Sequence, residues 1–433
     1  MIKKVLIITY YWPPSGGAGV QRWLKFVKYL PGFNVKPIVL TVDPAKASYP
    51  VIDESLYEKV PDGIITYRTD TLEFGHLYSK LIPSHKYPHG SFDNEEKPTP
   101  VQKISRFIRG NFFIPDARVG WKKYAVRKAR EILDQHEIDV IITTGPPHSV
   151  HLTGLKLSKN YNIKWIADFR DPWTDILYYN SLYHTPPIKK YDAKLERTVL
   201  EKADNIIIVS KSLKQLLVSK SNLILPQKVI VIPNGFMDED FSAPSKPPAD
   251  KFIITFTGSL SNNNNKMDAF AKGLARAVKA NNDVQFVFRF VGNINKSVDT
   301  LLEKYGLANI MEKIDYVPHF ESVKYLKSST AVFFVIRRTA TSKGILSGKL
   351  FDYLGSRKPI ICIGPVDGNA AEIIHECKAG KVIDYDDSEG VFEYLQQLVD
   401  RWRKNPDLDI REDRSKNYSV KNLTKKLVET INA

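Results

Sequence analysis

The residues with the clearest chemical potential lie near the start of the chain, in the segment YYWPPSGGAGVQRW (10–23). An apolar, β-branched run precedes this segment and apolar residues at helical spacing follow it, so Gly16 and Gly17 fall in a strand-to-helix turn. A helix amino terminus presents unpaired N–H groups and a positive dipole end, and glycine lets an anionic ligand approach the backbone. A tight turn that binds nothing is the alternative. The spacing is not the G-x-G-x-x-G of dinucleotide folds, which disfavours a nicotinamide or flavin enzyme.

Positive charge is the second chemical signal. The formal net charge is +15, which predicts an anionic partner such as nucleic acid, a lipid headgroup or a phosphorylated substrate. Residues 101–130 carry nine Lys or Arg against one Asp, interleaved with large apolar residues such as Phe107, Ile108 and Phe112. This mixture suits a surface helix on an anionic membrane. The alternative is an ordinary solvated helix whose apolar face belongs to the core.

Disulfide, zinc and membrane-spanning patterns are lacking in the sequence. Cys362 and Cys377 are too few and too poorly spaced for a disulfide framework or a zinc site, so we expect both to be buried. No apolar run approaches the ~18 residues of a membrane span, and the amino terminus has no secretory signal pattern. We therefore expect a cytoplasmic protein. The acidic segment DED (238–240) falls near a linker, and we do not assign a metal to it.

The elements that must position these residues alternate between strand-like and helix-like runs. Such alternation predicts βαβ units and therefore α/β domains with doubly wound parallel sheets. The 433 residues suffice for two such domains. We predict an N-terminal domain over 1–240, a linker over 241–250, a C-terminal domain over 251–414, and a final helix over 415–433 that can pack back on the N-terminal domain. Expected strands in the second half include 251–259, 284–292, 314–319, 331–336, 358–364 and 380–385.

The order of motifs resembles that of retaining glycosyltransferases of family 4, with the GT-B architecture of two Rossmann-like domains facing a central cleft. The matching motifs span nearly the whole chain: GGAGVQR, VSKSLKQ, VIPNGF, FTGSL, GKLFDYLGSRKPIICIG and GNAAEII. Within this family, TTGPPHSVHL and ADFRDPW resemble a bacterial subgroup that builds capsular, exopolysaccharide or lipopolysaccharide glycans.

The resemblance implies a binding site for a nucleotide-sugar donor, UDP- or GDP-linked, in the second domain. Relatives usually place an arginine just after the glycine of the turn that follows the domain's first strand, but here Ser259 follows Gly258. Lys266, after SNNNN, is the remaining candidate for the donor diphosphate, with the cluster Arg337, Arg338 and Lys343 as the alternative.

The family's pair of glutamates is also altered. The second position matches Asp352, which can accept hydrogen bonds from the ribose diol, whereas the first is Gly344. The loop ending in Ser347 and Gly348 can supply backbone groups instead. Lys349 lies one turn before Asp352 on the same expected helix, so both can face the cleft, although a surface ion pair between them is the alternative.

In the first domain, the resemblance points to three catalytic candidates. Relatives often carry a histidine at the strand end that here reads IKWIADFRDPW, which puts Arg170 near that position, beside Asp171. Arginine cannot act as a base but can hold a phosphate or a sugar hydroxyl, and a structural network with Asp168 is the alternative. His148 follows the turn GPP at a neighbouring strand end and is preferred to His151.

These expectations combine into one function. The enzyme is expected to transfer a sugar from a nucleotide-sugar to a hydroxyl of a lipid-linked or oligosaccharide acceptor, with retention of configuration and without a metal or other cofactor. It is expected in the cytoplasm or on the inner face of the plasma membrane. A nucleotide-sugar 2-epimerase of the same fold is the alternative enzyme. A basic nucleic-acid-binding protein is disfavoured because no known nucleic-acid motif is present.

Overall fold

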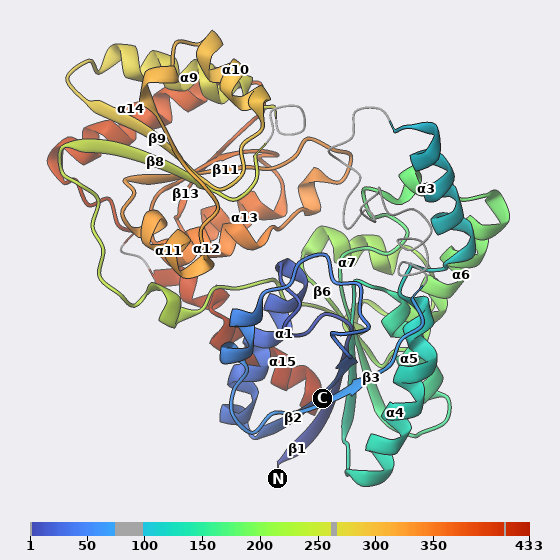
Figure 1. Cartoon of the computed structure of the whole chain (residues 1–433). Helices are drawn as coiled ribbons and strands as arrows, with labels where there is room; N and C mark the ends of the chain where they lie inside the picture. Colours follow the sequence, from blue (N-terminus) through green and yellow to red (C-terminus); the bar gives the residue numbers. More distant parts are fainter. Residues whose placement is uncertain (1, 74–97, 261–265, 411–412) are drawn as a thin grey trace. The chain divides into compact units, whose positions relative to one another are not determined.

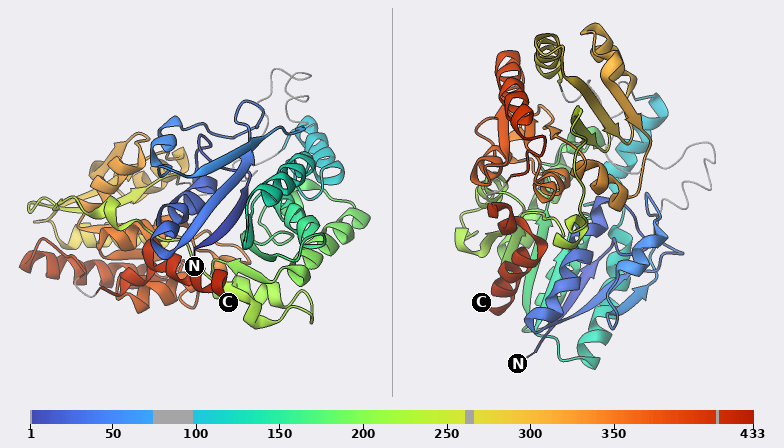
Figure 2. Two further views of the ribbon diagram at one scale, coloured as in Figure 1. Left: turned by 90° about the horizontal axis from the view of Figure 1, so that it is seen from below. Right: turned by 90° about the vertical axis from the view of Figure 1, so that its left-hand side faces the viewer.

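The computed structural model describes residues 2–73, 98–260, 266–410 and 413–433 (Figure 1). The chain folds into two compact units. Unit 1 comprises Met1–Ile232 and Thr424–Ala433, and unit 2 comprises Pro233–Leu423. The two ends of the chain therefore belong to the same unit, and they lie close to each other in each view (Figures 1 and 2).

Within the described residues, unit 1 is built on a seven-stranded parallel sheet in the order β3-β2-β1-β4-β5-β6-β7. Central strands of such a sheet are buried on both faces, which is why the strand residues form near-continuous apolar runs. Each of the seven strands coincides with one of the apolar, strand-like runs of the first half of the sequence. Their bounds are β1 Lys3–Thr9, β2 Val35–Val42, β3 Ile65–Thr69, β4 Val140–Thr144, β5 Lys164–Arg170, β6 Asn205–Ile208 and β7 Val229–Val231.

Helices cover both faces of this sheet. α4 and α5 lie on one side, and α1 with the end of α15 lies on the other (Figure 1). The helix bounds are α1 Ala18–Tyr29, α3 Pro100–Phe112, α4 Lys122–Gln135, α5 Ser149–Ser158, α6 Pro186–Lys202, α7 Lys211–Val218 and α15 Val420–Asn432. α15 is anchored in unit 1 by the fully buried Leu427 and Ile431 and by Lys164, whose Nζ donates to the Thr430 carbonyl at 2.6 Å.

Unit 2 repeats the design with a six-stranded parallel sheet, counted over the described residues, in the order β10-β9-β8-β11-β12-β13. The strand expected at 314–319 is wrong, because the structure forms β10 three residues earlier and Pro318 precedes a helix. β10 is an edge strand with polar residues at 312 and 313, so its apolar pattern is weak. The bounds are β8 Lys251–Thr257, β9 Gln285–Val291, β10 Met311–Ile314, β11 Ala331–Val335, β12 Ile360–Ile363 and β13 Gly380–Ile383.

Two apolar layers hold unit 2 together. Along β11, Phe333 joins the core beneath α9 and α14, while Val332 and Phe334 join the core beneath α12 and α13. Cys362 and Cys377 are buried in the second core, as expected from the sequence. The helices are α9 Asp268–Ala280, α10 Lys296–Lys304, α11 His319–Lys327, α12 Gly348–Ser356, α13 Asn369–Glu376 and α14 Ser388–Lys404.

Both sheets have the strand order of Rossmann-like folds, so the fold class expected from the sequence is confirmed. In each sheet the order reverses at the first strand, between β1 and β4 in unit 1 and between β8 and β11 in unit 2. Open α/β sheets bind ligands at the carboxyl ends of the strands beside this reversal. In the described part of the chain, no helix is long and apolar enough to cross a membrane.

Candidate functional site

The glycine turn after β1 only partly matches its expected role. The Gly16 amide was expected to face a phosphate, but it donates to the Val51 carbonyl at 2.8 Å and is not available. A Cβ at Gly16 would lie 2.9 Å from Val51 Cγ1, so this glycine serves close packing. Gly17 is exposed, has φ 82° and caps α1 without a side-chain hydrogen bond. An anion at this turn can therefore contact the amino terminus of α1 but not the Gly16 amide.

Arg22 and Asp168 form a buried ion pair behind this turn. The Asp168 carboxylate accepts hydrogen bonds from Arg22 at 3.3 Å, from Trp23 Nε1 at 2.7 Å and from Thr144 Oγ1 at 3.0 Å. Arg22 also donates to the Ile232 carbonyl at 2.8 Å. Burial lowers the pKa of Arg22, and the Asp168 charge opposes this shift. Asp168 is thus a structural residue that joins α1 to β4 and β5.

Arg170 and Asp171 lie beside the glycine turn. Arg170 ends β5 with φ 58°, where the register with β6 shifts, and its Nη1 donates to the Gly19 carbonyl at 2.8 Å. The Asp171 amide donates to the Phe169 carbonyl at 2.6 Å. Burial raises the pKa of the half-buried Asp171 carboxyl, and the neighbouring Arg170 charge opposes this shift. The backbone bend therefore places a carboxyl group of raised pKa near the start of α1.

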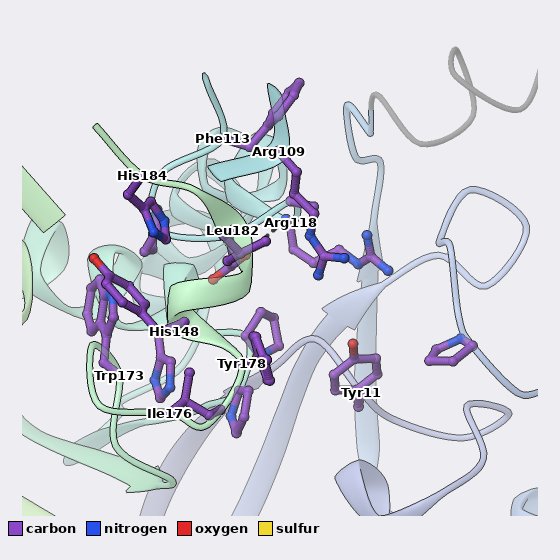
Figure 3. A pocket seen from close by; sticks show the side chains of 17 residues that line it. Tyr11, Arg109, Phe113, Arg118, His148, Trp173, Ile176, Tyr178, Leu182 and His184 are labelled. Atoms are coloured by element: carbon purple, nitrogen blue, oxygen red, sulfur yellow. Dashed lines mark hydrogen bonds between the residues drawn. The ribbon is translucent and has the colours of Figure 1, made fainter. Parts of the chain in front are cut away.

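His148 lies in a hollow of unit 1 (Figure 3). Its ring stacks on Trp173 with centroids 5.3 Å apart and an interplanar angle of 5°. Neither ring nitrogen makes a hydrogen bond of standard geometry, and an interaction with the Pro172 backbone only opposes the lowering of the pKa of His148. Burial holds the pKa of His148 well below 6.5, so the ring is neutral near pH 7. A buried polar group without a partner is costly, so this ring is suited to a ligand hydrogen bond.

His151 does not share this position. Its Nδ1 is 2.9 Å from Thr143 Oγ1, and its ring stacks on Phe169 with centroids 4.6 Å apart. Burial lowers the pKa of His151 to about 3. His151 is therefore a neutral core residue.

The hollow has a volume of about 100 Å³ and combines aromatic walls with charged groups. Gly110 of α3 lets this helix lie against Leu182, because a Cβ there would be 2.2 Å from the Leu182 carbonyl oxygen. This packing brings the end of α3 beside the loop that carries His184, whose ring stacks on Tyr179 at 4.3 Å. His184 Nδ1 is a further buried nitrogen of this lining without a hydrogen-bond partner. Aromatic lining residues are Tyr11, Phe113, Trp173, Tyr178 and Tyr179.

In unit 2, the structure brings together Gly258, Ser259 and Lys349 at the carboxyl end of β8. Gly258 has φ 98°, which L side chains rarely adopt, and a Cβ there would lie 2.7 Å from Lys349 Cε, so a larger residue would displace the end of the lysine side chain. Lys349 Nζ is 3.4 Å from the Ser259 carbonyl and 4.4 Å from the centre of the Phe256 ring. Burial lowers the pKa of Lys349 to about 8, so the group is mostly charged at pH 7.

Ser347 and Gly348 begin α12 directly before this lysine. Ser347 is the N-cap residue, but its Oγ is buried and makes no hydrogen bond. Gly348 is exposed, and a Cβ there would meet nothing within 4 Å. The first turn of α12 therefore has room for a ligand beside the Lys349 ammonium group.

Asp352 points to a different partner. Its Oδ2 is 3.5 Å from His319 Nε2, and His319 Nδ1 is 3.7 Å from Asp240 Oδ2. Within the described residues Asp352 makes no ion pair with Lys349. The surface pair that was the alternative for these two residues does not form.

Three other cationic candidates are exposed or ion-paired. Lys266 is exposed with φ 52°, directly after 261–265, which are outside the described residues. Arg338 is paired with Asp386 at 2.9 Å, and Lys343 is paired with Asp367. Over the described ranges, no three His, Cys, Asp or Glu side chains are grouped as metal ligands.

Family models match both halves of the sequence. The model described as Glycosyltransferase Family 4 matches residues 84–239, and the model described as Glycosyl transferases group 1 matches residues 251–401. The chain is a glycosyltransferase of the GT-B type. None of the curated proteins matches the sequence significantly.

Solved structures share the fold of this glycosyltransferase at low sequence identity. TarM of S. aureus is 12% identical with a TM-score of 0.63, covering 100% of this chain and 99% of its own. HepE from Anabaena, solved in complex with UDP, is 14% identical with a TM-score of 0.60 and full coverage of both chains. A candidate UDP-N-acetylglucosamine 2-epimerase from Listeria monocytogenes is 13% identical with a TM-score of 0.55, covering 100% and 96%. At these identities the likeness shows the fold alone.

Several residues of the glycosyltransferase's unit 1 hollow were not expected from the sequence. Arg109, Arg118, Tyr178 and His184 line it, but they come from a helix end and from loops without periodicity. For Tyr178 and His184 the signal in the sequence is the density of aromatic and histidine residues in YYNSLYH (178–184). Arg109 and Arg118 belong to the basic segment 101–130, which was interpreted as a membrane surface.

Proposed function

We propose that this glycosyltransferase moves a sugar from a nucleotide-sugar donor to a hydroxyl of a lipid-linked or oligosaccharide acceptor, with retention of configuration, in bacterial surface polysaccharide synthesis. The observation that carries the proposal is Lys349, which is held beside Gly258 at the strand end where this fold binds ligands. The UDP in the HepE structure supports a nucleoside diphosphate as the leaving group.

Unit 2 has the groups that a donor diphosphate needs. The Lys349 ammonium supplies the positive charge in place of the family arginine. Ser347 Oγ and the amide of Gly348 supply donors at the positive end of α12, because that helix start has no side-chain cap. Asp352 accepts from the ribose hydroxyls, and Lys266 is a second candidate cation for the diphosphate. The donor is UDP- or GDP-linked, and no further cofactor or metal takes part.

Unit 1 has the groups that an acceptor hydroxyl needs. The neutral His148 ring, with two unpartnered nitrogens, accepts a hydrogen bond from the acceptor. Arg170, Asp171 and the amide of Gly17 lie at the neighbouring strand end and contact the transferred sugar. Positioned donors of this kind stabilise the charge that develops in the transition state.

In the reaction, the bond between the anomeric carbon and the β-phosphate oxygen breaks as the acceptor oxygen bonds to the anomeric carbon from the same face. The acceptor proton passes to the departing phosphate oxygen. The products are the glycosylated acceptor and the nucleoside diphosphate. Lys349 stabilises the negative charge that grows on the diphosphate.

The proposal includes a peripheral membrane contact through α3. Thr99 caps this helix with a full capping box, so the helix is well defined. Its large apolar residues Val101, Ile104, Phe107, Ile108 and Phe112 are exposed, with Phe112 exposed to 73%. Lys103 is the exposed basic residue among them, whereas Arg106 is buried and Arg109 lines the hollow. An exposed cation beside apolar side chains favours an anionic lipid surface. We place the enzyme at the inner face of the plasma membrane.

A thermal-shift screen of nucleotide-sugars tests this function, because a ligand far above its Kd stabilises the fold by a few kcal/mol. We expect one nucleotide-sugar to raise Tm, and Lys349→Met to abolish the rise while the exposed Lys272→Met does not. If no nucleotide-sugar raises Tm, this result contradicts the proposal. Conversion of the donor to its epimer without an acceptor establishes the epimerase instead, and activity lost in chelator and restored by manganese contradicts metal independence.

A further inference from the structure

One fully buried carboxylate of α6 holds two side chains that form the wall of the unit 1 hollow. Asp192 Oδ1 accepts from the indole Nε1 of Trp173 at 2.9 Å, and Asp192 Oδ2 accepts from the Tyr179 hydroxyl at 2.9 Å. Both aromatic residues line the hollow, and Asp192 lies outside its lining. A single side chain behind the wall therefore fixes two of the rings that form it.

Each of these rings stacks on one of the two histidines of the lining. His148 stacks on Trp173 with centroids 5.3 Å apart and an interplanar angle of 5° (Figure 3). His184 stacks on Tyr179 with centroids 4.3 Å apart and an angle of 22°. Close packing couples the position of a stacked ring to that of its partner. Contacts therefore run from Asp192 through one aromatic ring to each histidine.

Glu196, one turn further along α6, shows what a stabilising carboxylate looks like in the same place. It accepts from the Trp173 amide at 3.3 Å and from Thr174 Oγ1 at 2.6 Å, and Lys220 Nζ lies 2.7 Å from it. Asp192 makes no ion pair with any residue that the structure describes. Burying a carboxylate without a counter-ion is costly. An apolar residue would stabilise the fold at lower cost, so this carboxylate indicates a positioning role.

The charge of Asp192 is stabilised by the same two aromatic side chains. Burial raises the pKa of Asp192 to about 7, and the hydrogen bonds from Tyr179 and Trp173 oppose this shift. The charges of Glu196 and Asp116 add to the rise. A hydrogen bond to an ionised acceptor is roughly twice as strong as one between neutral groups. The two bonds therefore restrain the rings more firmly than bonds to a neutral acceptor would.

We propose that Asp192 is a positioning residue of the acceptor site. Through Trp173 and Tyr179 it fixes the direction of the two histidine rings in the lining. This inference rests on the proposed function, because it concerns the hollow in which that function binds the acceptor hydroxyl. The Nδ1 atoms of His148 and His184 are buried and make no hydrogen bond of standard geometry, so the direction of these rings determines how an acceptor is bound.

NMR of the full-length protein with isotope-labelled histidine measures the ring positions without a substrate. The ring current of an aromatic neighbour shifts the C–H signals of a histidine stacked on it, and His148→Gln and His184→Gln assign the two signals. Asp192→Leu keeps the size of the side chain but cannot accept a hydrogen bond. We expect it to move both signals toward that of the exposed His375.

Two further variants separate the contacts. Asp192→Asn should keep both signals in place, because its oxygen still accepts from Trp173 and its nitrogen donates to the Tyr179 hydroxyl. Tyr179→Phe removes one hydrogen bond and keeps the ring, so it should move the His184 signal but not the His148 signal. Tyr179→Phe also carries the test if Asp192→Leu does not fold.

The kinetic test measures sugar transfer from the nucleotide-sugar that raises Tm. The acceptor probes are the octyl glycosides of glucose, galactose and N-acetylglucosamine. Asp192→Leu should raise the acceptor KM about tenfold, which corresponds to about 1.4 kcal/mol. The KM for the nucleotide-sugar should change less than about twofold, because the donor groups belong to unit 2. Asp192→Asn should recover most of the acceptor affinity.

Glu201→Gln is the matched control. Glu201 is another carboxylate of α6, and it accepts from Ser221 Oγ at 2.6 Å outside the lining of the hollow. Its replacement should change neither the histidine signals nor the acceptor KM. An effect as large as that of Asp192→Leu would show that any lost carboxylate of α6 disturbs the hollow, which overturns the inference.

The remaining outcomes separate this inference from the proposed function. Histidine signals that stay in place in Asp192→Leu and Tyr179→Phe overturn the inference and leave the transferase proposal intact. The same holds if the acceptor KM does not change, or if both KM values rise alike. If no nucleotide-sugar is bound or used by the wild type, the proposed function fails. The acceptor role of Asp192 then fails with it, even where the histidine signals respond as expected.

Discussion

The two units share one strand order, but the charged residues near the point where that order reverses are arranged differently in unit 1 and in unit 2. At the reversal of unit 1, between β1 and β4, Arg22 and Asp168 neutralise each other inside the protein. At the reversal of unit 2, Lys349 is held beside Gly258 and, in the described part of the chain, has no carboxylate partner. An internally paired charge stabilises the fold. A charge held without a counter-ion instead favours an external anion, so position in the fold alone does not identify a binding residue.

The largest expected effect comes from breaking the buried pair. Asp168→Ala leaves the Arg22 charge uncompensated, which should destabilise unit 1 by about 3–5 kcal/mol. Hydrogen exchange should show faster opening of β1 and β5 but not of β8 and β9. Asp386→Ala, which breaks an exposed pair of unit 2, should cost about 1 kcal/mol or less. Similar costs for both variants contradict a structural role for Asp168.

The next effect concerns the space beside Lys349. Gly258→Ala places a methyl group where Lys349 lies, so donor affinity should fall about 10- to 100-fold through loss of a charged hydrogen bond of about 1.5–3 kcal/mol. Gly306→Ala is the matched control, since Gly306 also has positive φ, at 72°, but a Cβ there meets nothing within 4 Å. Both variants carry backbone strain of about 1–2 kcal/mol. Titration with the nucleotide-sugar measures the affinity of both variants. If the affinity falls equally in both, backbone strain alone explains the loss.

A smaller effect follows from the titration of Lys349. Its pKa is lowered to about 8, so the group is charged below that pH and loses its proton as the pH rises. Donor affinity should therefore fall about tenfold between pH 7 and pH 9. Lys349→Arg keeps the charge, and its affinity should stay level over the same range. A wild-type affinity that does not change up to pH 9.5 argues against contact between Lys349 and the diphosphate.

The smallest effect concerns the exposed face of α3. Lys103→Gln should weaken binding to vesicles rich in anionic lipid about fivefold, because each basic residue near such a surface contributes about 1 kcal/mol. Lys194→Gln, at an exposed position of α6, should not change it. Cosedimentation with anionic and neutral vesicles measures both. Equal binding to the two vesicle types contradicts an electrostatic contact.

Strand positions could be predicted because parallel strands buried on both faces leave continuous apolar runs, as in β1 and β12. The exception, β10, lies at the edge of its sheet and carries Glu312 and Lys313. Edge strands are only partly buried, so their sequences are less constrained.

The contacts within the candidate sites were harder to predict. Two decisive contacts join residues that are distant in the sequence. The Gly16 amide donates to the Val51 carbonyl, and Arg22 pairs with Asp168. The contact between Gly258 and Lys349 likewise depends on how β8 and α12 pack. Motif positions indicated which residues to examine, but only the fold shows which charges are already paired.

The path of α15 affects how the protein responds to cleavage. The chain passes from unit 1 to unit 2 after Ile232 and returns within this helix after Leu423. A protease cut in 241–250 therefore does not free unit 2 from unit 1. The second fragment still contributes its last ten residues to the first fragment, with Leu427 and Ile431 fully buried there. The two fragments should copurify and, when expressed separately, reassemble by complementation, with the carboxyl-terminal end of α15 as the segment that joins them.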